Sequence, residues 1–193
     1  MKILYIHGLS SSGSSGTADR LRRFLPNDTI ISPDLPIEPQ EALKMLIELV
    51  VSKNIDLVIG TSMGGMFAQK IRGYAKILVN PSFHVSRSMR NKIGINKFFS
   101  PREDGATHYE ITADLCDRYE ELERIQFDNL TENEQALTIG LFGTADDIVN
   151  CSEEYKLHYT HFDCFNGGHR LSENDITNTI IPVIEKHRKH SNY

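Results

Sequence analysis

The sequence predicts a single three-layer α/β domain, in which helices cover both faces of a mostly parallel β-sheet. Apolar, β-prone runs alternate along the chain with helical patterns, and this alternation is typical of a parallel sheet. The length of 193 residues suits one domain with one well-packed core, and contents of 39% hydrophobic and 24% charged residues are ordinary for a globular protein. We therefore expect one domain over residues 1–193.

The first part of the chain is expected to supply four strands. They are predicted at residues 2–6, 29–32, 55–59 and 75–79. Helical patterns follow the first three of these runs: one around Leu21, one over residues 41–51, and one from the glycine-rich turn at 60–64 toward Gly73. Residues 10–16 are rich in Ser and Gly and lie between a strand and a helix, so they are interpreted as a long functional loop.

The pattern changes over residues 83–135, where the sequence becomes more polar. Loops are expected at residues 91–96 and 100–105. One amphipathic helix is expected in this stretch, with an apolar face formed by Leu115, Tyr119, Leu122 and Ile125. We interpret the stretch as a lid or cap inserted over the sheet. The remaining elements are expected to be strands at residues 137–142 and 159–165, and helices at 153–158 and from 173 to about 186.

The turn Gly60-Thr61-Ser62-Met63-Gly64 carries the strongest chemical signal. A serine at a very tight bend between a strand and a helix leaves no room for side chains two positions before and after it, and glycines stand at both positions. This spacing is that of a nucleophile elbow, in which Ser62 would be exposed and the Met63 amide would face a bound carbonyl oxygen. The alternative is an ordinary glycine-rich turn, because short motifs also occur by chance.

Two further residues follow strand ends, where ligands of parallel sheets bind. Asp146 comes after the fifth predicted strand and His169 after the sixth, and the chain order Ser, Asp, His is one that a known catalytic arrangement uses. In this hypothesis His169 accepts the proton of Ser62, because an imidazole with an ordinary pKa near 6.5 suits that task, while Asp146 holds the other ring nitrogen. The amides of Leu9 and Met63 would stabilise the resulting oxyanion.

Each assignment has an alternative. His169 could be a plain turn histidine, and Asp146 or the adjacent Asp147 could simply cap the following helix. Asp146 is preferred because it completes a Gly-x-x-Asp-x-x-Val pattern. His7 and Gly8, directly after the first strand, are expected to support the oxyanion loop, although His7 could also be a satisfied buried histidine.

Other clusters suggest no cofactor. Gly8 and Gly13 have the spacing of a phosphate-binding loop, but Ser14 and Ser15 stand where that motif requires Lys and then Ser or Thr. A second cluster contains possible metal ligands: His158, His161, Asp163 and Cys164. Their spacing matches no structural zinc site, so we expect no metal there. A third group could line an apolar acyl pocket or merely anchor the lid: Phe83, Phe98, Phe99 and Tyr109.

The charge balance argues against nucleic acid and anionic membranes as partners. The formal net charge is -5 with a pI near 5.9, and the one dense basic run, residues 186–190, is expected to be the solvated end of the last helix. No apolar stretch is long enough for a membrane span, and the short run at residues 3–6 is too brief for a secretory leader. Cys116, Cys151 and Cys164 form no C-x-x-C pair, which predicts free thiols and a cytoplasmic location.

Several motifs together resemble a known family. They are His7-Gly8-Leu9-Ser10-Ser11, Pro33-Asp34-Leu35-Pro36, Gly60-Thr61-Ser62-Met63-Gly64-Gly65, Val79-Asn80-Pro81 and Gly167-Gly168-His169. They resemble the small bacterial esterases of the YqiA type within the α/β-hydrolase superfamily. The resemblance is weakest over residues 83–135, and it implies a six-stranded sheet in the order 2-1-3-4-5-6.

The resemblance implies a serine esterase acting on short acyl esters or thioesters. Its triad would be Ser62, Asp146 and His169, with Leu9 and Met63 as oxyanion donors. We expect a carboxylesterase that forms an acyl-enzyme and whose partner is a small-molecule ester or thioester. The alternatives are a thioesterase or acyltransferase with the same triad, or a non-catalytic ligand-binding module of the same fold. The sequence leaves the oligomeric state open.

Overall fold

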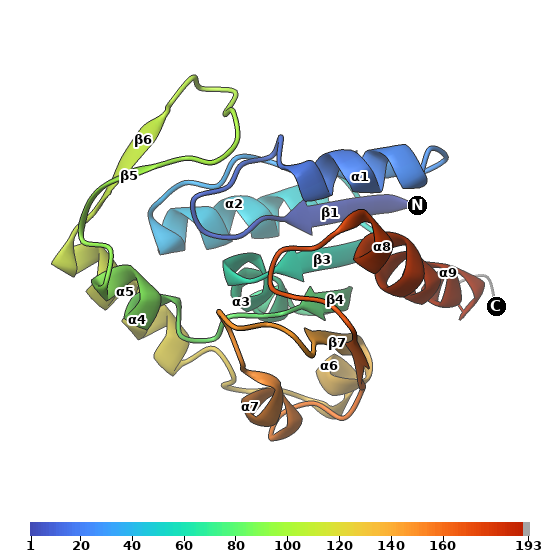
Figure 1. Cartoon of the computed structure of the whole chain (residues 1–193). Coiled ribbons are helices and arrows are strands. Elements are labelled where there is room, and N and C mark those ends of the chain that lie inside the picture. Colours follow the sequence, from blue (N-terminus) through green and yellow to red (C-terminus); the bar gives the residue numbers. More distant parts are fainter. Residues whose placement is uncertain (191–193) are drawn as a thin grey trace.

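The centre of the molecule is a six-stranded sheet (Figure 1), in a computed structural model that describes residues 1–190. Its strands are β1 (Lys2–Ile6), β2 (Thr29–Ile31), β3 (Leu57–Thr61), β4 (Ala75–Val79), β7 (Thr138–Gly143) and β8 (Phe162–Phe165). They lie in the order β2-β1-β3-β4-β7-β8, and every neighbouring pair is parallel. Because β5 and β6 belong to a separate hairpin, this is the predicted order 2-1-3-4-5-6.

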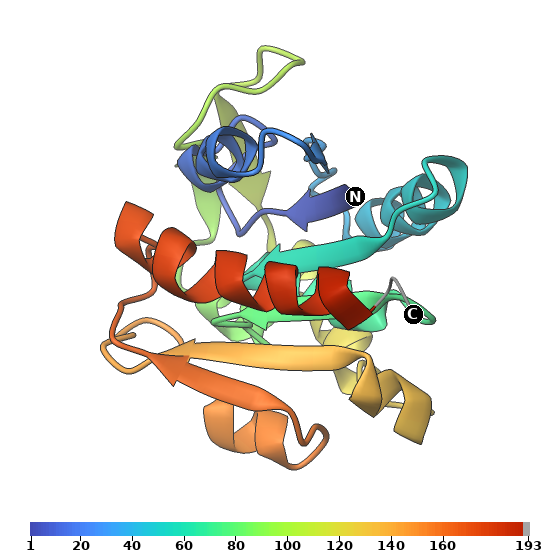
Figure 2. The same cartoon turned by 90° about the vertical axis from the view of Figure 1, so that its right-hand side faces the viewer.

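Helices cover both faces of this sheet, as the alternating sequence pattern predicted. On β1, Leu4 and Ile6 point into one apolar core, while Ile3 and Tyr5 point into the other, because successive strand residues face opposite sides. The first core is completed by α2 (Pro39–Ser52), α3 (Met63–Lys70) and α5 (Ala113–Arg124). The second core lies under α1 (Gly16–Phe24) and the final helix, which crosses the sheet in Figure 2.

The final helix is continuous but not uniform. It consists of α8 (Glu173–Asp175), a π-helical segment (Ile176–Ile180) and α9 (Ile181–His190), so it extends beyond the end predicted near Lys186. Arg188, expected in a solvated basic run, instead pairs with the buried carboxylate of Asp28 at 2.5 Å. The side chain of His190, in the same predicted run, lies outside the described residues.

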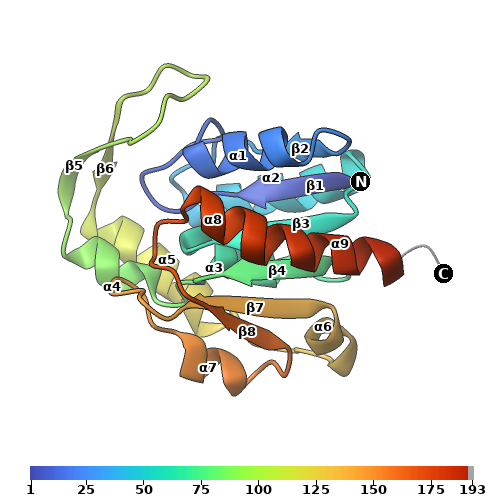
Figure 3. The same ribbon diagram turned by 45° about the vertical axis from the view of Figure 1, so that its right-hand side comes forward.

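The stretch over residues 83–135 contains more structure than expected. It forms α4 (Val85–Arg90), β5 (Gly94–Lys97), β6 (His108–Ile111), α5 and α6 (Glu132–Ala136). Strands β5 and β6 pair into an antiparallel hairpin that stands beyond the carboxyl ends of the main strands (Figure 3). The loop predicted at 91–96 is therefore wrong from Gly94 onward, whereas 100–105 lies in the hairpin's connecting loop.

Some predicted boundaries and faces also differ. Leu115, Tyr119 and Leu122 are buried as expected, but Ile125 follows the end of α5 and is 51% exposed. The last strand begins at Phe162, three residues later than predicted, because the chain first completes the turn after α7 (Ser152–Lys156). Within residues 1–190, none of the helices combines the length and hydropathy needed to cross a membrane.

Candidate active site

Ser62 occupies a strained bend between β3 and α3. Its φ of 54° and ψ of -122° are unusual for a residue with a side chain, and such conformations cost about 1–3 kcal/mol. A Cβ at Gly60 would lie 2.2 Å from the carbonyl oxygen of Gly64, and one at Gly64 would lie 2.0 Å from that of Ile6. Both positions therefore require glycine. The spacing of the two glycines around Ser62 predicted this crowding.

His169 lies between Ser62 and Asp146. Its Nε2 is 3.0 Å from the Oγ of Ser62, and its Nδ1 is 2.8 Å from Oδ2 of Asp146. The other carboxylate oxygen of Asp146 accepts hydrogen bonds of 2.9 Å from the amides of Ile148 and Val149. Because the carboxylate is held from both sides and only 3% exposed, it favours the tautomer in which Nδ1 carries the proton and Nε2 is free to accept one.

The structure distinguishes between the two adjacent aspartates. Asp146 is the one that contacts His169, whereas Asp147 is exposed. Asp146 does not cap the next helix, α7, whose N-cap is Cys151; its Oδ1 instead accepts the amides of Ile148 and Val149 in the loop before that helix. One carboxylate thus closes its own loop and orients the histidine.

Asn80 is a residue of this site whose role the sequence did not indicate. Its Oδ1 accepts a hydrogen bond from the amide of Gly143 at 2.7 Å, and its Nδ2 donates to the carbonyl of Gly168 at 3.0 Å. The first contact lies at the start of the loop that carries Asp146, and the second lies directly before His169. The position of Asn80, just after β4 and next to the elbow strand, was the available signal.

The loop after β1 is supported by His7 and Gly8. His7 is buried, its Nε2 accepts a hydrogen bond from the Leu35 amide at 3.3 Å, and its Nδ1 donates to the carbonyl of Gly8 at 2.9 Å. Burial lowers the pKa of His7 to about 4, so the ring is neutral at pH 7. A Cβ at Gly8 would lie 3.2 Å from the Cβ of Ser62, so glycine lets this loop approach the serine closely.

The amides of Leu9 and Met63 remain available at this site. Both residues line the same cleft as Ser62. Among the described residues, neither amide has an intramolecular hydrogen-bond partner. Met63 is the first residue of α3, where a helix leaves its amides without internal acceptors.

The cleft around Ser62 and His169 has a volume of about 510 Å³. Of the aromatic residues expected either to line an acyl pocket or to anchor the lid, Phe99 lines this cleft and is 72% exposed. The other three are packed: Phe83 is fully buried, and Phe98 lies against Tyr109 with ring centres 4.7 Å apart. Phe83 and Tyr109 belong to the same buried core as Leu4 and Ile6 of β1, and Phe98 packs against that core, so most of this group anchors residues 83–135 to the sheet.

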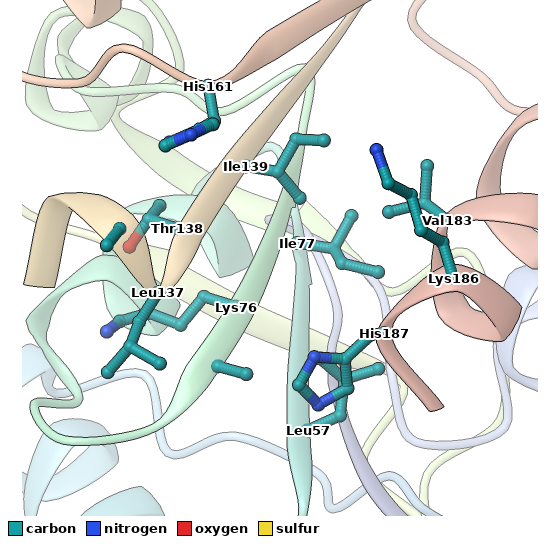
Figure 4. Close-up of a pocket in the computed structure, with 12 residues that line it drawn as sticks. Leu57, Lys76, Ile77, Leu137, Thr138, Ile139, His161, Val183, Lys186 and His187 are labelled. Carbon is teal, nitrogen blue, oxygen red and sulfur yellow. The ribbon is translucent and has the colours of Figure 1, made fainter. Parts of the chain in front are cut away.

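A second hollow of about 370 Å³ lies at the opposite edge of the sheet (Figure 4). It is bounded by the first residues of β3, β4 and β7 and by α9, and Leu57, Ile77 and Ile139 give it an apolar floor. Ligands of parallel sheets bind at the carboxyl ends of the strands, and this hollow lies at their amino ends.

The histidines and acids near β8 form no cluster. His158 stacks on Phe127 with ring centres 3.7 Å apart, and His161 lines the second hollow. Over residues 1–190, no group of three or more His, Cys, Asp or Glu side chains is arranged to hold a metal ion.

Comparison with solved structures identifies the fold. The chain is similar to Est1E from Butyrivibrio proteoclasticus, with a TM-score of 0.64 and 11% identity over 97% of this chain and 88% of that one. Mouse alpha/beta hydrolase domain-containing protein 10 is similar with a TM-score of 0.61 and 14% identity, over 97% of this chain and 90% of that one. The methylesterase MES16 from Arabidopsis is similar with a TM-score of 0.60 and 9% identity, over 98% of this chain and 99% of that one. At these identities the likeness shows the α/β-hydrolase fold.

A family model assigns the chain on its sequence. The match covers residues 2–169, which include Ser62, Asp146 and His169, and it agrees with the resemblance to YqiA-type proteins. The chain belongs to the family described as Uncharacterised protein family (UPF0227).

Proposed function

We propose that this protein is a serine hydrolase that cleaves carboxylic esters of short acyl groups through an acyl-enzyme. The observation that carries the proposal is the chain of hydrogen bonds from Ser62 through His169 to Asp146, placed at a strained bend beside a cleft. Solved proteins of the same fold include an alpha/beta hydrolase domain-containing protein and a methylesterase, which supports hydrolase chemistry.

In the first half-reaction, the Oγ of Ser62 attacks the carbonyl carbon of the ester, and its proton passes to Nε2 of His169. Asp146 stabilises the imidazolium that forms. The amides of Leu9 and Met63 donate to the oxyanion, and each such donor contributes about 3 kcal/mol to lowering the barrier. Nε2 then gives its proton to the leaving alcohol, whose bond to the acyl carbon breaks.

In the second half-reaction, water attacks the acyl-enzyme and transfers a proton to His169. The tetrahedral intermediate collapses, Ser62 regains the proton, and the carboxylic acid leaves. A thioester would pass through the same steps with a thiol as leaving group, and an acyltransferase would use another acceptor in place of water. No step requires a metal or an organic cofactor.

A fluorophosphonate probe tests the proposal, because it reacts only with an activated serine. We expect labelling of the folded protein that disappears in Ser62→Ala and falls by about 10³-fold or more in His169→Ala. Ser88→Ala is the matched control, since Ser88 lines the same cleft and has no contact with His169. Absence of labelling in the folded wild-type protein would instead favour the non-catalytic binding module.

We also propose a cytoplasmic location. The support is chemical: Cys116, Cys151 and Cys164 are all free thiols, and Cys164 is exposed. Free exposed thiols are typical of reducing compartments.

A further inference from the structure

The cleft beside Ser62 is lined by cations. Its charged lining residues, apart from His169, are Arg20, Lys92 and Arg170, and no Asp or Glu of the described residues lines it. The whole chain has the opposite balance, with 26 acidic against 21 basic residues. A positively charged cleft in a protein with a negative net charge concentrates anionic ligands.

The charge of these three cations is unpaired within the part of the chain that the structure describes. Among the described residues, Arg20, Lys92 and Arg170 form no ion pair, whereas six other arginines do. The guanidinium of Arg20 donates to the carbonyl of Leu171 at 3.4 Å, and that of Arg170 lies 5.8 Å from the ring centre of Phe99. These contacts hold both groups at the cleft and leave their charge unbalanced.

Two of the cations are linked to the segment that carries His169. Nε2 of His169 protonates the leaving oxygen or sulfur, so that part of the substrate has to lie next to the histidine. Arg170 is the next residue in the chain, and Arg20 is bonded to Leu171, one residue further. Lys92 comes from the turn after α4, on the inserted stretch.

We propose that the substrate carries an anionic group, a carboxylate or a phosphate, on its alcohol or thiol part, and that Arg20 and Arg170 bind this group. The inference rests on the proposed function, since it identifies the substrate class of the same site. Guanidinium groups suit such anions because their N–H donors match the spacing of carboxylate and phosphate oxygens.

Two isosteric esters measure the effect of charge alone: 4-carboxyphenyl butanoate and 4-carbamoylphenyl butanoate. The neutral amide withdraws electrons at least as strongly as the carboxylate, so leaving-group ability does not favour the acid. We expect kcat/KM to be about 10- to 100-fold higher for the carboxylate, the range of a charge-assisted contact. The same ester with a phosphonate in place of the carboxylate distinguishes the two anions by which one is preferred, and a preference for either supports the proposal.

Variants assign the preference to residues. Arg20→Gln and Arg170→Gln should each lower the carboxylate-to-amide ratio of kcat/KM, and the double variant should bring it close to one. The ratio is insensitive to a general loss of folded enzyme, because both esters report on the same active molecules. Arg87→Gln is the control, since Arg87 is an exposed arginine of α4 that does not line the cleft, and its ratio should equal that of the wild type.

A second ester pair places the charge on the acyl side: phenyl hydrogen adipate and the corresponding phenyl adipamate. A charge preference confined to this pair would overturn the leaving-group assignment. Equal turnover within all pairs, with hydrolysis still dependent on Ser62, would also overturn it and leave the proposed function intact. Failure to hydrolyse any ester, together with no fluorophosphonate labelling, would overturn both proposals.

Discussion

The side chain of Asn80 holds Gly168, the residue before His169, through a hydrogen bond of 3.0 Å to its carbonyl. The same carboxamide accepts the amide of Gly143 at 2.7 Å, so one buried group ties together the loops that carry the histidine and the aspartate. The hydrogen bonds between Ser62, His169 and Asp146 depend on how these two loops lie relative to the elbow.

Replacing Asn80 with Ala should therefore misplace the histidine. We expect kcat to fall about 10- to 100-fold with little change in KM, because displacements near 1 Å have effects of that size on positioned groups. Asn166→Ala is the matched control, since Asn166 is an exposed residue of the same histidine loop. A variant Asn80→Ala with wild-type kcat would show that the two loops hold their positions without this bridge.

We expect the substitution of Asp by Asn to affect kcat differently at Asp146 and at Asp147. Asp146→Asn should lower kcat by roughly 10³- to 10⁴-fold, because the amide no longer favours the tautomer that His169 needs. Asp147→Asn should leave kcat near that of the wild type, since Asp147 is exposed and has no contact with the ring. Steady-state kinetics on a phenyl ester compare the two, and a larger loss in Asp147→Asn would reverse the assignment.

The hairpin formed by β5 and β6 is hydrogen-bonded to the loop that carries Leu9. The hydroxyl of Tyr109 lies 2.5 Å from the Oγ of Ser10, and the amide of Phe99 donates to the carbonyl of Ser10 at 2.8 Å. Tyr109→Phe removes the first bond and keeps the ring, so we expect kcat to fall about 3- to 10-fold, the equivalent of one hydrogen bond. Tyr74→Phe, directly before β4 and not part of the cleft lining, should have no effect on kcat.

The layers of the fold and the elbow follow from short-range sequence patterns. Gly60 and Gly64 predicted the bend because crowding at such a turn is local, and the strands were found because each is an apolar run bounded by turn residues. The hairpin was missed because its first strand has little apolar signal: Ile95 is 72% exposed, and burial is confined to alternate residues of β6, Tyr109 and Ile111.

The electrostatic and bridging features of the site depend on contacts between distant segments. Asn80 acts on loops that begin more than 60 residues later in the chain. The cations of the cleft come from α1, from the turn after α4 and from the loop after β8, and no window of sequence contains them together. Only the packing of the sheet brings such residues to one edge.

His7 predicts a specific dependence of stability on pH. Its folded pKa of about 4 is below the ordinary value of 6.5, so between these two pH values the unfolded chain binds more protons. The resulting stability is fully present above pH 6.5 and is lost as the pH falls toward 4, and the difference in pKa corresponds to roughly 3 kcal/mol.

His7→Gln keeps a polar side chain at this position and removes the titration. Urea unfolding of both proteins at several pH values measures the effect, and the free energy of unfolding should fall more steeply with acid in the wild type than in the variant. Parallel curves over that range would show that His7 is not the group responsible. The comparison between the two proteins cancels the contribution of the carboxylates that titrate in the same range.

A buried ion pair joins α6 to β4. The ammonium of Lys76, on β4, is fully buried and lies 2.7 Å from Oε2 of Glu134, whose other oxygen accepts the amide of Gly73. Burial lowers the pKa of Lys76, and the hydrogen bond that Lys76 donates to Glu134 opposes that effect. Glu134→Gln removes the compensating charge, so we expect a loss of about 3–5 kcal/mol in the free energy of unfolding.

The double variant Lys76→Met with Glu134→Gln should be more stable than Glu134→Gln alone, because it leaves no uncompensated charge in the interior. Glu153→Gln is the surface control: the exposed pair of Glu153 and Lys156 should contribute less than about 1 kcal/mol. Urea unfolding followed by circular dichroism compares the four proteins. If Glu134→Gln destabilises no more than Glu153→Gln, the buried lysine is not held charged by its partner, and the contact between α6 and β4 depends on packing alone.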